Sequence, residues 1–172
     1  MPFALGQRSL TRSAHVDPKL MAVVALAIAG SPVDFGMTED QSRTAEEQLK
    51  KFNDGVSKIR PGPAARHMIQ PDGYSKAVDL VPWIDGKFQW GDGQWRVTTQ
   101  AGLVMRPFFD IAAAMQAAAI KLHTPIRWGA IWDRVLNDLN PGAHALALQM
   151  EDYKARHPGP DFLDGPHFEL IS

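Results

Sequence analysis

Helix signals alternate with short β-prone segments along this chain, and that alternation limits the folds open to it. Asp17 and Pro18 are typical of the first positions of a helix and precede the apolar run 19–29. Thr44 and Glu47 form a capping-box pattern that predicts a second helix from residue 44 to about residue 52. We expect two more helices, an alanine-rich one over residues 99–122, with Pro107 near its first turn or kinking it, and another over residues 142–156.

The β-prone segments between these helices are short, and they include 33–38, 125–128 and 167–171. Residues 66–70 and 74–81 flank a Pro-Asp-Gly turn and are expected to pair as a hairpin. Residues 83–95 hold three glycines and two aspartates, which favours an exposed loop or ribbon. These strands are too few and too short for a doubly wound sheet, so we predict a small α+β fold. A length of 172 residues suits one domain.

The composition limits the possible metal ligands and gives no support for nucleic-acid binding or membrane insertion. The sequence has no cysteine, so any metal must be held by His, Asp or Glu. The net charge is −1 and the basic residues are scattered, which argues against nucleic-acid binding. The first ten residues lack a secretory pattern, and the longest apolar run, 20–29, is shorter than the about 20 residues that span a bilayer. We therefore expect synthesis in the cytoplasm without a signal peptide, and no membrane insertion.

Two segments carry residues suited to metal chemistry. Asp79 lies within the apolar segment 77–81, where a buried carboxylate is costly unless it is paired or bound to a cation. Near the C-terminus, strand alternation places His167 and Glu169 on one face, while their neighbours face the core. Asp164, in the preceding turn, is expected to lie beside whatever His167 binds. Taken singly, each residue also has an ordinary structural interpretation, as a satisfied histidine or an edge or turn aspartate.

The order of short motifs along nearly the whole chain resembles a family of zinc metallopeptidases. The motifs are Arg8-Ser9-Leu10, Asp34-Phe35, Ser42-Arg43-Thr44 with Gln48, His67, Ala77-Val78-Asp79-Leu80, Arg127-Trp128-Gly129 with Trp132, and Asp164-Gly165-Pro166-His167-Phe168-Glu169-Leu170. The family includes phage L-alanyl-D-glutamate endolysins and bacterial D-alanyl-D-alanine carboxypeptidases and dipeptidases. The resemblance implies a small antiparallel sheet with helices packed around it and a zinc site on the sheet, as in DD-peptidases and hedgehog domains.

The resemblance also implies roles for individual residues. His67, Asp79 and His167 match the family's three zinc ligands, Asp164 its general base, and Arg43 an arginine that steadies the oxyanion. Two neutral imidazoles and one carboxylate leave zinc a net positive charge, which lowers the pKa of a bound water. Asp164 would accept the proton of that water, and Arg43 would supply a cationic donor where negative charge develops.

Several features leave more than one interpretation open. Glu169 either orients His167 or is an exposed carboxylate on the strand face. Residue 65 is alanine where the family has serine, and eleven residues separate His67 from Asp79, a longer spacing than usual that a longer hairpin can absorb. The extra segment 130–162 is either a packing helix or a lid or wall-contacting face. Three tryptophans either pack under the ribbon or stack on sugar rings: Trp83, Trp90 and Trp95.

The sequence thus favours one catalytic domain over residues 1–172, a zinc endopeptidase that cuts the L-Ala–D-Glu bond of peptidoglycan stem peptides. The first and last motifs resemble the endolysin branch, so a D-Ala-D-Ala carboxypeptidase with the same metal site is the second interpretation. A third is a zinc domain that binds the wall without catalysis. We expect a monomer whose partner is bacterial peptidoglycan, and which reaches the periplasmic wall after release by a holin.

Overall fold

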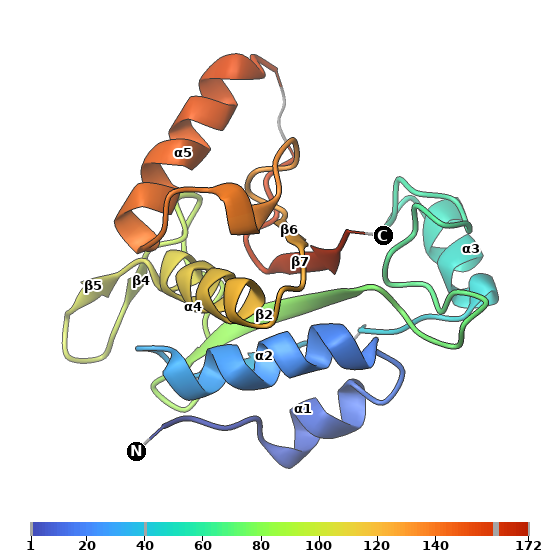
Figure 1. Ribbon diagram of the computed structural model, residues 1–172, viewed down its shortest axis with the longest axis horizontal. Coiled ribbons are helices and arrows are strands. Elements are labelled where there is room, and N and C mark those ends of the chain that lie inside the picture. The colour runs from blue at the N-terminus through green and yellow to red at the C-terminus, as the bar shows by residue number, and fades with distance from the viewer. Residues whose placement is uncertain (1, 40, 160–161, 172) are drawn as a thin grey trace.

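An antiparallel sheet with helices packed on one face forms the centre of the protein. The computed structural model describes residues 2–39, 41–159 and 162–171. The strand order is β1 (Phe35–Met37), β2 (Ala77–Ile84), β7 (His167–Leu170) and β6 (Ile126–Trp128), and β3 (Lys87–Phe88) pairs with the far end of β2. Helices α2 (Pro18–Gly30) and α4 (Pro107–Lys121) pack together over one face of this sheet (Figure 1). The α+β prediction is confirmed.

The two predicted helix starts are confirmed in their capping contacts. The carboxylate of Asp17 accepts a hydrogen bond from the backbone N–H of Lys19 at 2.8 Å, at the start of α2. In α3 (Ala45–Asn53), the Thr44 hydroxyl accepts from the N–H of Glu47 and the Glu47 carboxylate accepts from the N–H of Thr44. Such caps satisfy amide groups that the first turn of a helix leaves unpaired.

The register of β2 against β7 decides which side chains share a face. Val78 lies opposite Phe168 and Asp79 lies opposite His167. Val78 and Phe168 are buried in the core under the helices, where complete burial of such a side chain contributes about 1.5–3 kcal/mol. Because the side chains of a strand alternate, Asp79 and His167 lie side by side on the other face. Core packing thereby fixes the pairing of two candidate metal ligands.

The expected hairpin of residues 66–70 with 74–81 is wrong, although its turn exists. The N–H of Gln70 donates to the carbonyl of Tyr74 at 3.0 Å, but residues 66–70 form no strand. The carbonyl of Arg66 also accepts from the N–H of Lys76 at 2.7 Å. The middle of this segment, however, pairs with Arg43, through Arg43 N–H to His67 O and Ile69 N–H to Arg43 O, both at 2.8 Å. The edges of β2 are already occupied by β1 and β7, so the segment turns to the chain that precedes α3.

The predicted helix over 99–122 is correct only from residue 107 onward. Pro107 is the first residue of α4, where its missing N–H and fixed φ cost nothing. The residues before it form a small hairpin of β4 (Val97–Thr98) and β5 (Val104–Met105), with Gly102 at a φ of +79° in the turn. The alanine-rich composition that suggested a longer helix belongs to the part of α4 after the proline.

The extra segment 130–162 contains the predicted helix, apart from residues 160–161, which lie outside the described chain. It forms a 3₁₀ turn, η1 (Leu136–Asp138), and α5 (Ala143–Arg156), which packs on the core through Leu146, Met150 and Tyr153. Helix α1 (Gln7–Arg12), which the sequence did not predict, docks on β1 through a hydrogen bond from the N–H of Met37 to the Ser9 hydroxyl. Among the described residues, no helix has the length and apolar character needed to cross a membrane.

Candidate metal centre

Three side-chain atoms form a nearly equilateral triangle on the open face of the sheet. Nε2 of His67 and Nδ1 of His167 each lie 3.3 Å from Oδ1 of Asp79, and the two nitrogens are 3.2 Å apart. A tetrahedral metal ion with bonds of about 2.0–2.1 Å separates its ligand atoms by about 3.3 Å. The three residues therefore fit three corners of such a tetrahedron, and they could hold a metal ion.

The hydrogen bonds of both histidines direct a lone pair into this triangle. Nδ1 of His67 lies 3.1 Å from the carbonyl oxygen of Gln41, and Nε2 of His167 lies 3.2 Å from Oε2 of Glu169. A carbonyl and a carboxylate can only accept, so each of these nitrogens carries the hydrogen. The other nitrogen of each ring is then free to coordinate, which is the usual arrangement around metal-binding histidines.

The electrostatics of the triangle also call for a positive charge. Oδ1 of Asp79 is buried and lies 3.3 Å from a ring nitrogen of each histidine. Burial would raise the pKa of Asp79, but the charge of His67 and the hydrogen bond with His167 hold it far below its ordinary value. Burial would lower the pKa of His167, yet hydrogen bonds with Asp79 and Glu169 raise it to about 9. These shifts favour a cation in the triangle, either a proton or a metal ion.

Gln41 joins two of the ligands and was not identified from the sequence. Its side chain is fully buried, and its amide oxygen accepts a hydrogen bond from the N–H of Asp79 at 2.8 Å. Its amide nitrogen donates to the carbonyls of Thr38 and Asp79, both at 3.2 Å. With its main-chain carbonyl on His67, this residue positions both ligands. A single glutamine in a loop carries no sequence signal of such a role.

Asp164 lies in a turn that is joined to β6 and β7 by backbone hydrogen bonds. Its N–H donates to the carbonyl of Gly129 at 2.9 Å, and the N–H of Gly129 donates to the carbonyl of His167 at 2.9 Å. Burial and the negative charge of Asp79 raise the pKa of Asp164, while the two histidines oppose that rise. These interactions give Asp164 a greater proton affinity than an ordinary aspartate, and its carbonyl accepts a hydrogen bond from the N–H of the ligand His167 at 3.1 Å.

Arg43 is held beside His67 by the backbone pairing described above. Its Nη1 donates to Oε1 of Gln48 at 3.3 Å, and Nε2 of Gln48 donates to the carbonyl of Ile59 at 2.6 Å. Its Nε is buried and has no hydrogen-bond partner among the described residues. Gln48, quoted among the sequence motifs, therefore orients the arginine, whose guanidinium keeps a donor for another group.

Glu169 is buried, which removes the interpretation as an exposed strand-face carboxylate. Besides His167, its carboxylate contacts Nη1 of Arg127 at 3.1 Å and Nε of Arg66 at 4.0 Å. Burial would raise the pKa of Glu169, but the hydrogen bond with His167 and the two arginines keep it below its ordinary value. The Trp132 ring lies 5.2 Å from that of His167, so the imidazole is confined on a second side.

The tryptophans of residues 83–95 differ in their surroundings. Trp95 packs against Phe108, Phe109 and Trp128, so it lies under the ribbon as one interpretation expected. Trp83 is 40% exposed and packs edge-on against Phe88, whereas Trp90 is 57% exposed. The packing interpretation therefore holds for Trp95.

Comparison with known proteins adds to this geometry. The sequence profile of the phage L-alanyl-D-glutamate peptidase family matches residues 1–171. An L-alanyl-D-glutamate peptidase of Escherichia phage T5 is 26% identical over 133 residues, which are 77% of this chain and 84% of the relative. The crystal structure of the L-Ala D-Glu endopeptidase ChiX of Serratia marcescens superposes with a TM-score of 0.64 and 23% identity, over 99% of this chain and 91% of that one.

Proposed function

Because the chain belongs to the phage L-alanyl-D-glutamate peptidase family, we propose that it hydrolyses the L-Ala–D-Glu bond of peptidoglycan with a zinc ion held by His67, Asp79 and His167. The observation that carries the proposal is the triangle of ligand atoms with edges of 3.2–3.3 Å. When bound there, zinc would activate a water molecule and polarise the scissile carbonyl.

The residues around the triangle supply the remaining chemistry. Asp164 accepts the proton of the attacking water and delivers it to the departing amino group of D-glutamate, a task that its raised pKa favours. Arg43, whose backbone is paired with that of His67, offers its guanidinium to the negative charge that develops on the carbonyl oxygen. Glu169 holds the His167 ring in the tautomer that leaves Nδ1 free.

The family membership favours this function over the two alternatives. The matching family is defined by cleavage after L-alanine, which separates this chain from D-Ala-D-Ala carboxypeptidases that share the ligand set. A wall-binding domain without catalysis has no need for a carboxylate of raised pKa beside the ligands, and Asp164 is such a group. We further propose that residues 1–172 form one catalytic domain, which acts as a monomer and reaches the cell wall after release by a holin.

Two substitutions separate zinc binding from catalysis. His67→Ala should lose stoichiometric zinc, whereas Asp164→Asn should keep about one zinc per chain and lose activity by roughly 10²–10⁴-fold. Zinc is measured by elemental analysis, and activity by release of peptides from purified peptidoglycan. His144→Ala, at an exposed position of α5, is the matched control and should behave as the wild type. Full zinc content in His67→Ala would contradict the ligand assignment, and full activity in Asp164→Asn would contradict the assignment of the base.

A further inference from the structure

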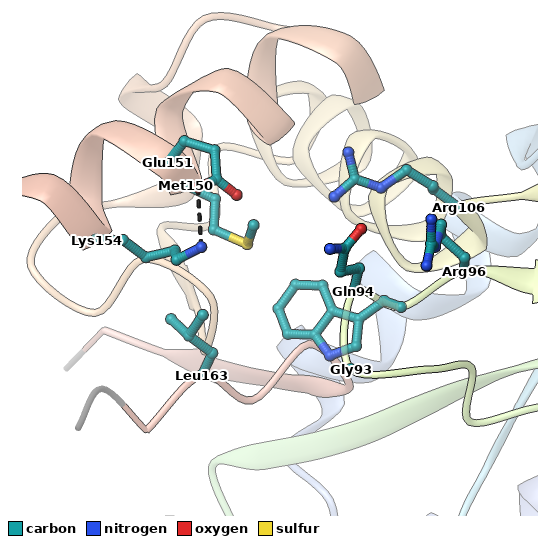
Figure 2. A pocket seen from close by; sticks show the side chains of 9 residues that line it. Gly93, Gln94, Arg96, Arg106, Met150, Glu151, Lys154 and Leu163 are labelled. Carbon is teal, nitrogen blue, oxygen red and sulfur yellow. Dashed lines mark hydrogen bonds and ion pairs between the residues drawn. The ribbon is translucent and has the colours of Figure 1, made fainter.

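A pocket of about 670 Å³ lies behind the turn that carries Asp164. It opens between residues 93–96, the start of α4 and the exposed side of α5. Figure 2 shows Arg96 and Arg106 on one side of the pocket and Lys154 on the other, with Leu163 below. The lining residues are Gly93, Gln94, Trp95, Arg96, Arg106, Met150, Glu151, Lys154 and Leu163.

The side chains around this pocket give it a net positive charge. Lys154 is paired with Glu151 at 2.9 Å, and Arg96 is paired at 2.8 Å with Asp92, which adjoins the pocket. Arg106 has no carboxylate partner among the described residues, and its guanidinium lies 4.2 Å from the centre of the Phe109 ring. Its charge is therefore available to a ligand, and the planar guanidinium is suited to a carboxylate.

The pocket shares a wall with the catalytic turn. Leu163 lines the pocket, and the carbonyl of the next residue, Asp164, accepts a hydrogen bond from the N–H of His167 at 3.1 Å. The indole of Trp95 lies against Gly165, where an added Cβ would come within 2.9 Å of the ring. Trp95 also has a φ of +56°, a conformation that a non-glycine residue keeps only when its surroundings enforce it. The pocket wall and the proposed base are therefore one residue apart along the chain.

The chemistry of the proposed substrate is asymmetric about the scissile bond. On the D-glutamate side the stem peptide carries free carboxylates, beginning with the α-carboxylate of D-glutamate, which is linked onward through its γ-carboxyl group. On the L-alanine side it continues into the lactyl group and the sugar, which carry no charge. Two or three residues of extended peptide span about 7–11 Å, a reach suited to a pocket one residue from Asp164.

We propose that this pocket binds the carboxylate-bearing part of the stem peptide that follows the scissile bond, with Arg106 as the principal anion-binding residue. The inference rests on the proposed function and adds the region that recognises the leaving half of the substrate. It also gives the extra helix α5 a role, because Met150, Glu151 and Lys154 form one wall of the pocket. Helix α5 then contacts substrate as well as packing on the core.

The test compares two soluble stem peptides that contain the same L-Ala–D-Glu bond. One has free carboxylates after that bond, and in the other these groups are carboxamides. The wild type should cleave the carboxylate peptide with a kcat/KM at least about tenfold higher, as expected for one charged contact. Arg106→Gln should lose about that factor on the carboxylate peptide and little on the amide, whereas Arg106→Lys should restore part of the preference.

Lys121→Gln provides the matched control. This exposed cation lies at the opposite end of α4, roughly 20 Å from Arg106 at 1.5 Å per residue, and its removal should leave both kcat/KM values unchanged. The pocket assignment would be overturned if the wild type cleaved the two peptides equally, or if Arg106→Gln lost the same factor on both. New D-glutamate N-termini in those experiments would still support the proposed function. Absence of those N-termini with every peptide would overturn both.

Discussion

The main-chain carbonyl of Gln41 accepts a hydrogen bond from Nδ1 of His67 at 3.1 Å. The amide oxygen of the same glutamine accepts from the N–H of Asp79 at 2.8 Å. One of these candidate ligands lies in the loop before β2 and the other lies in β2. Both are thus held by one buried residue outside the metal triangle. The proposed site depends on this second layer as much as on the ligands themselves.

Replacing Gln41 with leucine should weaken both the fold and the metal site. The substitution leaves the buried N–H of Asp79 without its acceptor, at a cost of about 1–3 kcal/mol in the free energy of unfolding. Zinc affinity should fall by roughly 10–100-fold because Asp79 is no longer held in place. Denaturant unfolding and competition with a chelator measure the two effects. Unchanged zinc affinity would show that Gln41 supports only the fold.

Alanine at position 129 should displace the proposed base. A Cβ on Gly129 would lie 2.4 Å from the carbonyl oxygen of Asp164 and 3.0 Å from the Cβ atoms of Asp164 and His167. Backbone must therefore move, and we expect kcat to fall at least about tenfold, as for other small displacements of a catalytic group. Gly30→Ala is the control, because nothing lies within 4 Å of its added Cβ. Wild-type kcat in Gly129→Ala would contradict a fixed position for Asp164.

Replacing Glu169 with glutamine should lower zinc affinity without removing a ligand. Glutamine keeps an acceptor for His167 but loses the charge that strengthens the hydrogen bond and balances Arg127. We expect about a tenfold weaker zinc affinity and a lower midpoint of unfolding, while His67, Asp79 and His167 remain the ligands. Titration with zinc in the presence of a competing chelator gives the affinity. A variant that binds zinc as tightly as the wild type would rule out a positioning role for Glu169.

The sequence indicated the candidate metal ligands but not all of the backbone segments that hold them in place. Asp79 was identifiable because a carboxylate stands in an apolar strand, and His167 because a strand follows the turn at Asp164. Core packing of Val78 and Phe168 fixes the register of β2 against β7, and strand alternation then places Asp79 and His167 together on the opposite face. His67 lies in a loop without periodicity, so only the family resemblance indicated it.

The errors of prediction have physical causes that local patterns do not contain. The segment 66–70 could pair with β2 by composition, but tertiary contacts with Arg43 compete for its backbone groups. The start of α4 was predicted too early because the alanine-rich composition outweighed the helix-start signal at Pro107. Gln41 and the arginines around Glu169 act through long-range hydrogen bonds, and such contacts leave no spacing to detect.

Zinc binding should release a proton near neutral pH. The pKa of His167 is raised from 6.5 to about 9, so this residue is protonated at pH 7 in the metal-free protein, whereas coordination requires the neutral ring. The stabilising contacts of the protonated ring are present below the unfolded pKa and are lost as the pH rises through about 9. Zinc affinity should therefore rise up to about tenfold per pH unit between pH 7 and 9. Calorimetry in two buffers of different ionisation enthalpy measures the released protons, and a buffer-independent enthalpy would contradict the prediction.

The most direct test of the central claim is mass spectrometry of the peptides released from purified peptidoglycan by the zinc-loaded protein. New peptides with N-terminal D-glutamate should form, disappear when the metal is removed with a chelator, and return when zinc is restored. Loss of only terminal D-alanine would contradict the proposed scissile bond. Cleavage that continues undiminished after complete metal removal would contradict the role of His67, Asp79 and His167 as the ligands of a catalytic zinc.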